Sequence, residues 1–235
     1  FLETLNRLNR DKNLKKKVLA FVNVPGWVGE PREELKKRLA SKKTYDTPLE
    51  CPFITHWLHN MTHDQVLDML KYLGMNNNPE DNVKVIFVPC YLDGKDGIIN
   101  QQYYDIILGQ DLSCYPSYYE PWGYTPLESV AFRVPTITTD LAGFGRWVKG
   151  LKQNGGLKDG VEVIHRSDYN YSEVADAIKD TISDFSGKSE KEVNLMRKHA
   201  AQVAEQALWK HFIIYYYEAY DVALRHAAQR LLRGK

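Results

Sequence analysis

The sequence predicts an α/β protein with a Rossmann-like, doubly wound and mostly parallel sheet, followed by a helical C-terminal extension. Short apolar runs typical of buried strands alternate with helical patterns as far as Ile164. Beyond that point the apolar spacing is helical throughout. Alternating strands and helices favour a parallel sheet covered by helices on both faces. We therefore expect residues 1–186 to form the Rossmann-like domain and residues 187–235 to form a helical extension packed on it.

The expected elements follow the apolar pattern along the chain. Strands are expected at residues 18–24, 83–88, 112–115, 135–139 and 161–164, with 54–56 as a short strand or a loop. Helices are expected at residues 2–8, 31–40, 63–73, 101–108, 126–132, 172–184, 189–206 and 209–232, with a loop at 140–145. The apolar run at 18–24 predicts a strand buried on both faces.

The composition is that of an ordinary globular protein. Of the 235 residues, 43% are hydrophobic and 26% are charged, and the net charge is +1. This balance gives no reason to expect nucleic acid or a membrane as a partner, and no apolar run is long enough to cross a bilayer. Three cysteines without close spacing argue against a disulfide framework and for a reducing, cytoplasmic location. The chain opens on Phe1 within a helical pattern, from which we expect a fragment of a longer protein.

One stretch, residues 116–129, carries the strongest functional signal. It follows an expected strand, breaks at a proline and a glycine, and restarts as a helix. Thr125 suits the N-cap, Pro126 suits the first helical position, and Glu128 completes a capping box. Open α/β sheets bind anionic groups at such a turn, because the first backbone N–H groups of the helix are unpaired.

Two carboxylates flank that helix start. Glu128 either completes the cap or contacts a ligand, and the sequence leaves both interpretations open. Glu120 lies in the turn and has no capping role, which favours a function for it. The loop that holds Gly143 and Gly145 follows the next strand and opens at the same edge. Two glycine-bearing loops on one edge suggest a nucleotide diphosphate between them, although the Gly-x-Gly pair alone is a weak signal.

These residues resemble a known family. Residues 116–128, with 135–139 and 143–145, closely resemble the C-terminal domain of glycogen synthases of the animal and fungal type. Those enzymes are retaining glucosyltransferases with two Rossmann-like domains, the GT-B architecture, in glycosyltransferase family 3. The first block is highly specific, and weaker similarity runs along nearly the whole chain.

The resemblance implies the nucleotide-sugar-binding half of an enzyme that transfers glucose from UDP-glucose to the non-reducing end of an α-1,4-glucan, with retention of configuration. It implies that Glu120 lies near the donor sugar as the catalytic carboxylate. The implied donor contacts are Glu128 at the ribose, the backbone of Gly123, Tyr124 and Thr125 at the diphosphate, Gly143 and Phe144 at the sugar pocket, and Tyr103 against uracil. It implies no metal and no cofactor, because cations on the protein can neutralise the phosphates.

The resemblance also indicates what this chain needs in order to act. In the family, a basic pair that grips the diphosphate lies ahead of the segment matching Phe1, and an N-terminal domain carries acceptor contacts. We therefore expect these residues alone to be inactive. A homo-oligomer of the full-length form is compatible with the sequence. The stretch that matches the family's arginine-rich sugar-phosphate sensor keeps only Arg197, Lys198 and Lys191 as basic candidates. We expect no activation by a sugar phosphate.

Two rival hypotheses remain. Another retaining GT-B transferase would use ADP-glucose or a different acceptor. A non-catalytic glucan-binding domain would present exposed aromatic rings, for which the tyrosines at 215–217 are candidates. His56, His59 and His63 could share a helix face, but nothing else in the sequence supports a metal site.

Overall fold

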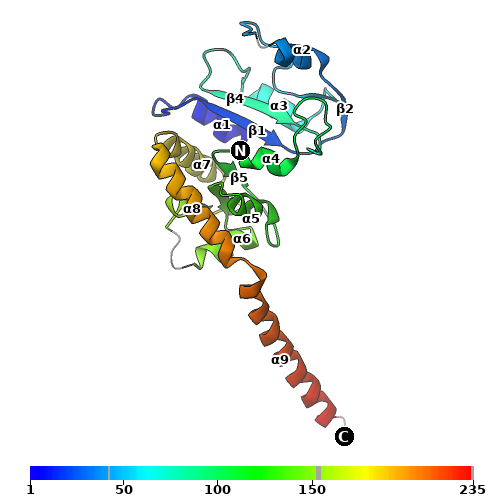
Figure 1. Cartoon of the computed structure of the whole chain (residues 1–235), viewed down its shortest axis with the longest axis vertical. Helices are drawn as coiled ribbons and strands as arrows, with labels where there is room; N and C mark the ends of the chain where they lie inside the picture. Colours follow the sequence, from blue (N-terminus) through cyan, green and yellow to red (C-terminus); the bar gives the residue numbers. More distant parts are fainter. Residues whose placement is uncertain (42, 152–154, 234–235) are drawn as a thin grey trace.

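The structure is a computed structural model that describes residues 1–41, 43–151 and 155–233. It has an α/β body from which one long helix projects (Figure 1). The strands are β1 (Val18–Asn23), β2 (Val28–Pro31), β3 (His56–Leu58), β4 (Val83–Val88), β5 (Ser113–Cys114), β6 (Thr136–Thr139) and β7 (Val161–Ile164). The helices are α1 (Leu2–Asn9), α2 (Glu33–Ser41), α3 (Gln65–Tyr72), α4 (Tyr103–Leu108), α5 (Tyr124–Ala131), α6 (Gly143–Lys149), the 3-10 turn η1 (Leu157–Asp159), α7 (Tyr171–Ser186), α8 (Glu190–Gln206) and α9 (Trp209–Arg233).

Parallel pairing dominates the strands, which confirms the predicted α/β class. Strand β1 runs parallel to β4, with Val18 opposite Val83 and Asn23 opposite Val88. Strand β6 is flanked on both sides by parallel neighbours, β5 and β7. Strands β2 and β3 form a separate antiparallel pair that holds the one short segment left undecided by the sequence. Within the described ranges the strands thus form three separate sheets instead of one continuous sheet.

Strand β1 differs from its expected environment. Only Ala20 and Val22 are buried, whereas Leu19 is 53% exposed. The side chains of a strand alternate between the two faces of a sheet, and here one face points into the core. The prediction of burial on both faces is therefore wrong for these residues.

The core joins the two parallel sheets. One buried apolar cluster takes Val22 from β1, Val85 from β4 and Ile137 from β6. Helix α1 packs on both α7 and β4, so the same helical layer spans the two sheets. A second, smaller cluster lies under α8 and centres on Phe144 and Val148 of α6.

The two helices of the C-terminal extension behave differently. Helix α8 starts with a capping box formed by Ser189 and Glu192 and packs on α5 and η1. A Cβ atom at Gly160 would lie 2.4 Å from the backbone nitrogen of Ala200, so the glycine permits this close packing.

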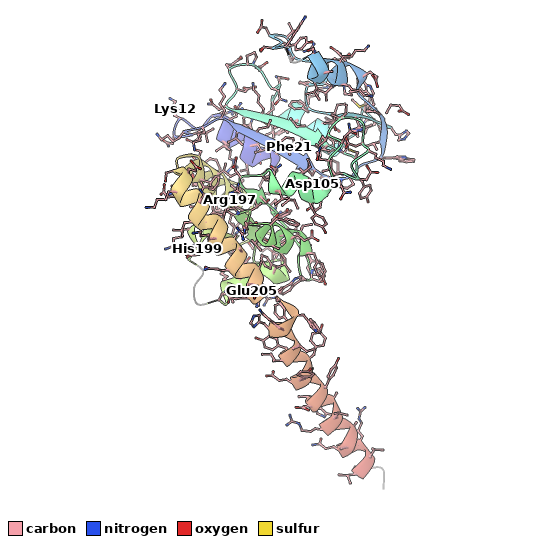
Figure 2. All side chains as sticks on the ribbon, viewed as in Figure 1. Lys12, Phe21, Asp105, Arg197, His199 and Glu205 are labelled. Carbon is pink, nitrogen blue, oxygen red and sulfur yellow. The ribbon has the colours of Figure 1, made fainter. Side chains whose placement is uncertain are left out.

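Helix α9 leaves the body after its first turns (Figure 1). Its side chains project around it (Figure 2), and those of Tyr217 and Leu224 are among the exposed apolar groups. Helix α8 packs on the body, and the first turns of α9 contact it through Phe212, whose ring centroid lies 5.5 Å from that of Trp122. None of the helices in the described part of the chain is both long and apolar enough to cross a membrane.

Candidate functional site

The turn between β5 and α5 is joined to the start of α6 by backbone hydrogen bonds. The N–H of Gly143 donates to the carbonyl of Glu120 at 3.1 Å, and the N–H of Phe144 donates to that of Trp122 at 2.6 Å. Glu120 also forms a parallel β-bridge with Ala142. The two glycine-bearing segments therefore meet at one edge, as the sequence indicates.

The two glycines after β6 open a helix and not the loop that we expected at 140–145. A Cβ atom at Gly143 would lie 2.1 Å from the carbonyl oxygen of Pro121, and one at Gly145 would lie 2.1 Å from that of Thr139. Both glycines are needed because backbone passes where a side chain would be. Glycine is a poor helix former, so its presence in the sequence favoured a loop, and tertiary packing overrides that preference.

The side chain of Glu120 is half-buried and accepts a hydrogen bond from one neighbouring side chain. Ser117 donates its hydroxyl hydrogen to Glu120 Oε2 over 3.1 Å. The carbonyl of Ser117 in turn accepts from Thr139 Oγ1 at 2.6 Å, which anchors the turn to the end of β6. The same Oε2 atom lies 3.3 Å from the position that a Cβ atom of Gly123 would take. The carboxylate therefore lies directly beside the start of α5.

Helix α5 begins earlier than expected, and its cap is different. Its N-cap is Gly123, with a left-handed φ of +107°, and no side chain caps the helix. The predicted capping box is wrong, because Thr125 already lies inside the helix. A glycine can take this φ without strain, so the chain enters the helix two residues before the expected cap. The first N–H groups of α5 have no side-chain acceptor, which is the arrangement that suits an anion.

Glu128 faces the start of α4. Its Oε1 atom accepts a hydrogen bond from the Tyr104 hydroxyl at 3.1 Å. Beside it, burial raises the pKa of the Tyr103 phenol, and Tyr115 and Glu128 add to this effect. Glu128 thus contacts α4, whereas Glu120 lies beside Gly123 at the start of α5.

An aromatic cluster backs this region. The ring of Trp122 lies 6.1 Å from that of Phe144, 6.0 Å from that of Trp147 and 5.5 Å from that of Phe212 in α9, measured between centroids. Phe144 is 0% exposed, so its ring packs against Trp122 inside this cluster and is closed to solvent.

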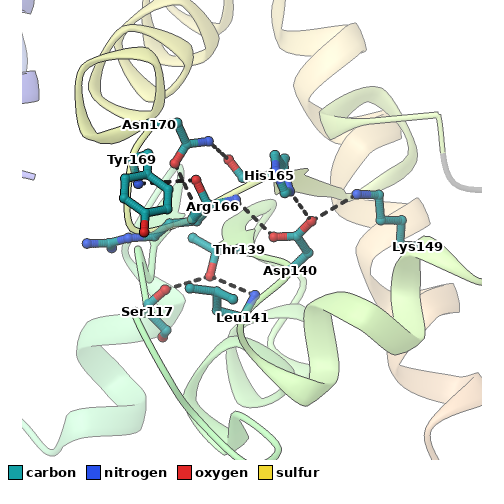
Figure 3. Close-up of polar contacts among 10 residues, drawn as sticks. Ser117, Thr139, Asp140, Leu141, Lys149, His165, Arg166, Tyr169 and Asn170 are labelled. Carbon is teal, nitrogen blue, oxygen red and sulfur yellow. Dashed lines mark hydrogen bonds and ion pairs between the residues drawn. The ribbon is translucent and has the colours of Figure 1, made fainter.

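The sequence did not indicate the polar network around Asp140, shown in Figure 3. Its Oδ2 atom accepts from His165 Nδ1 at 2.8 Å and from Lys149 Nζ at 3.1 Å, and its Oδ1 atom accepts from the Arg166 N–H at 2.9 Å. Partial burial alone would raise the pKa of Asp140, but these hydrogen bonds outweigh it and lower the pKa to about 2. Charged residues just after the two strands, 136–139 and 161–164, are the only signal that could have pointed to it.

Arg166 links this network to the turn that bears Glu120. Its guanidinium donates to the carbonyl of Pro116 and lies 5.2 Å from the ring of Tyr118. An open cavity of about 460 Å³ lies next to the network. It is lined by Asp140, Leu141, Arg146, Lys149, Gly150, His165 and Arg166.

The three histidines do not share a helix face. His56 is in β3, and α3 begins only at Gln65. Possible ligand atoms of His56, Cys90 and Asp96 lie within 4.8 Å of one another. The His56 ring nitrogens already contact Thr55 Oγ1 and the Asp96 carbonyl, and the Asp96 carboxylate accepts from three backbone N–H groups of the loop that follows it. The ring nitrogens of His56 and the carboxylate of Asp96 thus already have hydrogen-bond partners in the protein, which favours a structural role for them.

Comparison with known proteins identifies the family. Residues 28–232 match the family model described as glycogen synthase. The chain belongs to the glycogen synthase family. Among curated glycogen synthases, the Neurospora crassa enzyme is 30% identical over 206 residues, and isoform 1 of Saccharomyces cerevisiae is 32% identical over 196 residues. The Caenorhabditis elegans enzyme is 33% identical over 168 residues.

The matches cover most of this chain but little of its relatives. They span 88%, 82% and 71% of this chain and 29%, 27% and 25% of the three relatives in that order. Among solved structures, a sucrose-phosphate synthase from Thermosynechococcus elongatus matches with a TM-score of 0.46 and 15% identity, over 96% of this chain and 49% of that one. The glycogen synthase match includes the whole region from Tyr103 to Phe144.

Proposed function

We propose that this chain is the donor-binding part of a retaining glucosyltransferase that transfers glucose from UDP-glucose to the non-reducing end of an α-1,4-glucan. The observation that carries the proposal is the half-buried carboxylate of Glu120 beside the uncapped start of α5, in a chain of the glycogen synthase family. This arrangement places a negative charge and a set of free N–H donors side by side.

The two features answer the two electrostatic needs of the reaction. A retaining transfer builds positive charge at the anomeric carbon and negative charge on the departing diphosphate. Glu120 stabilises the first, and the N–H groups at Gly123, Tyr124 and Thr125 stabilise the second. The hydrogen bond from Ser117 orients the carboxylate before the substrate arrives.

The other end of the helix start suits the nucleoside. Glu128 is the carboxylate for the ribose hydroxyls, and its hydrogen bond with Tyr104 holds it in place. Tyr103, the first residue of α4, offers a ring beside it for the base. Gly143 and the backbone of Phe144 border the glucose.

The activity belongs to a longer chain in this proposal. The relatives are more than three times as long as the matched region, and the glucan acceptor and a second Rossmann-like domain are assigned to that longer protein. Residues 1–235 alone are then inactive, although they retain weak nucleotide affinity.

The test replaces Glu120 by Gln in the full-length gene product and measures glucosyl transfer and UDP affinity. Transfer should fall by at least about 100-fold, because the variant loses the charge that the transition state needs. UDP affinity should stay within about twofold, because the carboxylate faces the sugar and not the nucleotide. Glu80→Gln, an exposed loop position, is the matched control. Transfer by Glu120→Gln at the level of the control would refute the assignment.

The identity of the nucleotide needs its own measurement. Competition between UDP and ADP for the full-length protein separates UDP-glucose from ADP-glucose as the donor. Tighter binding of ADP than of UDP would replace the donor in this proposal and leave the role of Glu120 unchanged.

A further inference from the structure

We propose that Arg166 is a positioning residue for the glucosyl transfer. It holds the turn that bears Glu120 in the geometry that the reaction needs, and it acts through the backbone of residues 116–118 and not as a ligand of the substrate. This inference rests on the proposed function of Glu120. It assigns a role to a residue that lies 46 positions further along the chain and belongs to a different strand end.

The Arg166 side chain contacts the start of this turn at two points. Its guanidinium donates a hydrogen bond to the carbonyl of Pro116. The guanidinium carbon also lies 5.2 Å from the ring centroid of Tyr118, within the range of a cation–π contact. Strand β5 ends at Cys114, so both contacts fall on residues that have just left the sheet. Arginine suits this task, because its planar guanidinium can donate to an oxygen and stack on an aromatic ring at the same time.

The backbone of Arg166 is itself anchored to the neighbouring strand end. Its N–H donates to Asp140 Oδ1 at 2.9 Å, which joins the residues that follow β7 to the residue that follows β6. His165 and Lys149 hold the other carboxylate oxygen of Asp140 (Figure 3). The base from which the Arg166 side chain reaches the turn is therefore fixed by several charge-assisted hydrogen bonds.

A second tie from the same edge reaches the residue that orients Glu120. Thr139 Oγ1 donates to the Ser117 carbonyl at 2.6 Å (Figure 3), and the Ser117 hydroxyl donates to Glu120 Oε2 at 3.1 Å. Pro116 and Ser117 are adjacent, so the ends of β6 and β7 hold one short piece of backbone from two sides. The far end of the turn is bonded to the start of α6. Arg166 thus secures the near end of the segment that carries the carboxylate.

A fixed carboxylate matters more for the transition state than for donor binding. The charge of Glu120 stabilises the positive charge that develops at the anomeric carbon, and this effect depends on the carboxylate being in place before the reaction. A displacement of about 1 Å in a catalytic group can cost about 100-fold in rate. Release of the near end of the turn should therefore lower kcat and leave the donor KM almost unchanged.

The test is Arg166→Ala in the full-length gene product, with glucosyl transfer to glycogen measured at varied UDP-glucose. We expect kcat to fall by about 10-fold to 100-fold and the donor KM to change by less than about threefold. Arg146→Ala is the matched control, because Arg146 is an exposed arginine that lines the same cavity. It should keep kcat within about twofold of the wild type. A kcat for Arg166→Ala equal to that of this control would overturn the proposal.

A double-mutant cycle shows whether Arg166 acts through Glu120. In a Glu120→Gln background, Arg166→Ala should lower kcat by less than about twofold, because the charge that it positions is already gone. Equal fold-losses in the two backgrounds would overturn this inference and leave the proposed function standing. Wild-type transfer by Glu120→Gln alone would instead refute the proposed function, and this inference with it.

Arg166→Lys gives an independent readout and remains informative if the alanine variant does not fold. Lysine keeps the charge and a donor for the Pro116 carbonyl but lacks the planar guanidinium. We expect its kcat to recover to within about fivefold of the wild type at an unchanged donor KM. A folded lysine variant that is at least about 10-fold slower than the wild type would contradict the contacts assigned to Arg166.

Discussion

Gly143 shows how one missing side chain fixes the geometry of the site. Its Cα lies against the Pro121 carbonyl, and its N–H donates to the Glu120 carbonyl, so the residue holds the turn that bears Glu120 from two directions. A methyl group at this position would force the turn and the start of α6 apart.

Gly143→Ala should therefore lower the free energy of unfolding by about 2–3 kcal/mol, since backbone and not a flexible side chain occupies the space. Urea denaturation measures the loss. Gly109→Ala is the control, because its added Cβ would meet only a carbonyl at 3.5 Å. Equal stability of the two variants would show that the turn can move without cost.

The lowered pKa of Asp140 makes the free energy of unfolding depend on pH at acid pH. Its folded pKa of about 2 lies below the unfolded value near 3.9, so its contribution is complete above about pH 4 and is lost as the pH falls to about 2. Asp140→Asn should cost about 1–2 kcal/mol at pH 7, allowing for solvent screening of this partly exposed group. Urea denaturation should show a lower free energy of unfolding for Asp140→Asn than for the wild type at pH 7. This difference should disappear at pH 2. A difference independent of pH would point to lost packing instead.

At the scale of elements, α5 and α6 show where sequence patterns fail. Where the helical spacing of apolar residues extends over many residues, as in α7, α8 and α9, the predicted bounds lie within two residues of those in the structure. The start of α5 and the whole of α6 were misjudged, because a left-handed glycine and two closely packed glycines decide them. Local propensity does not contain the approach of another backbone, and only the folded chain reveals it.

The sequence predicts the residues of the candidate site, but it does not predict the polar network beside them. The carboxylate and glycine positions follow from turn chemistry and family resemblance, and the structure brings Glu120, Gly123 and Gly143 together. The Asp140 network was missed because its members come from two distant strand ends, which no spacing rule connects.

Helix α8 supplies a test of how its basic residues are used. The guanidinium of Arg197 donates to the carbonyl of Gln110 at 2.8 Å and contacts Asp111 at 3.4 Å, which ties α8 to the segment before β5. Arg197→Ala should cost about 1–2 kcal/mol in urea denaturation, because the carbonyl loses its charged donor. Lys198→Ala, at an exposed position, should stay within about 0.5 kcal/mol. A sugar phosphate that raises activity of the full-length wild type but not of the Arg197 variant would contradict this structural role.

At the scale of the whole molecule, the described residues form three separate sheets where the sequence predicts one, and most of the described side chains of α9 are exposed. The α/β class and most of the elements follow from the sequence, but β2 and α6 do not. The sheet division and the course of α9 do not, because both depend on which surfaces meet.

The full-length protein should also keep its activity without a metal. The proposed stabilisation of the leaving diphosphate relies on the start of α5 and on protein cations, so EDTA should change glucosyl transfer by less than about twofold. Loss of activity in EDTA that added Mg²⁺ restores would require a divalent ion in the donor site.

The contact between Trp122 and Phe212 has a practical consequence. The indole lies two residues after Glu120 and contacts the first turns of α9, so its environment depends on both the turn that bears Glu120 and the projecting helix. Its fluorescence is a built-in optical reporter: donor binding at the turn and displacement of α9 should each change its emission. Trp122 can therefore report both events in the unlabelled protein, once the other four tryptophans have been replaced by phenylalanine.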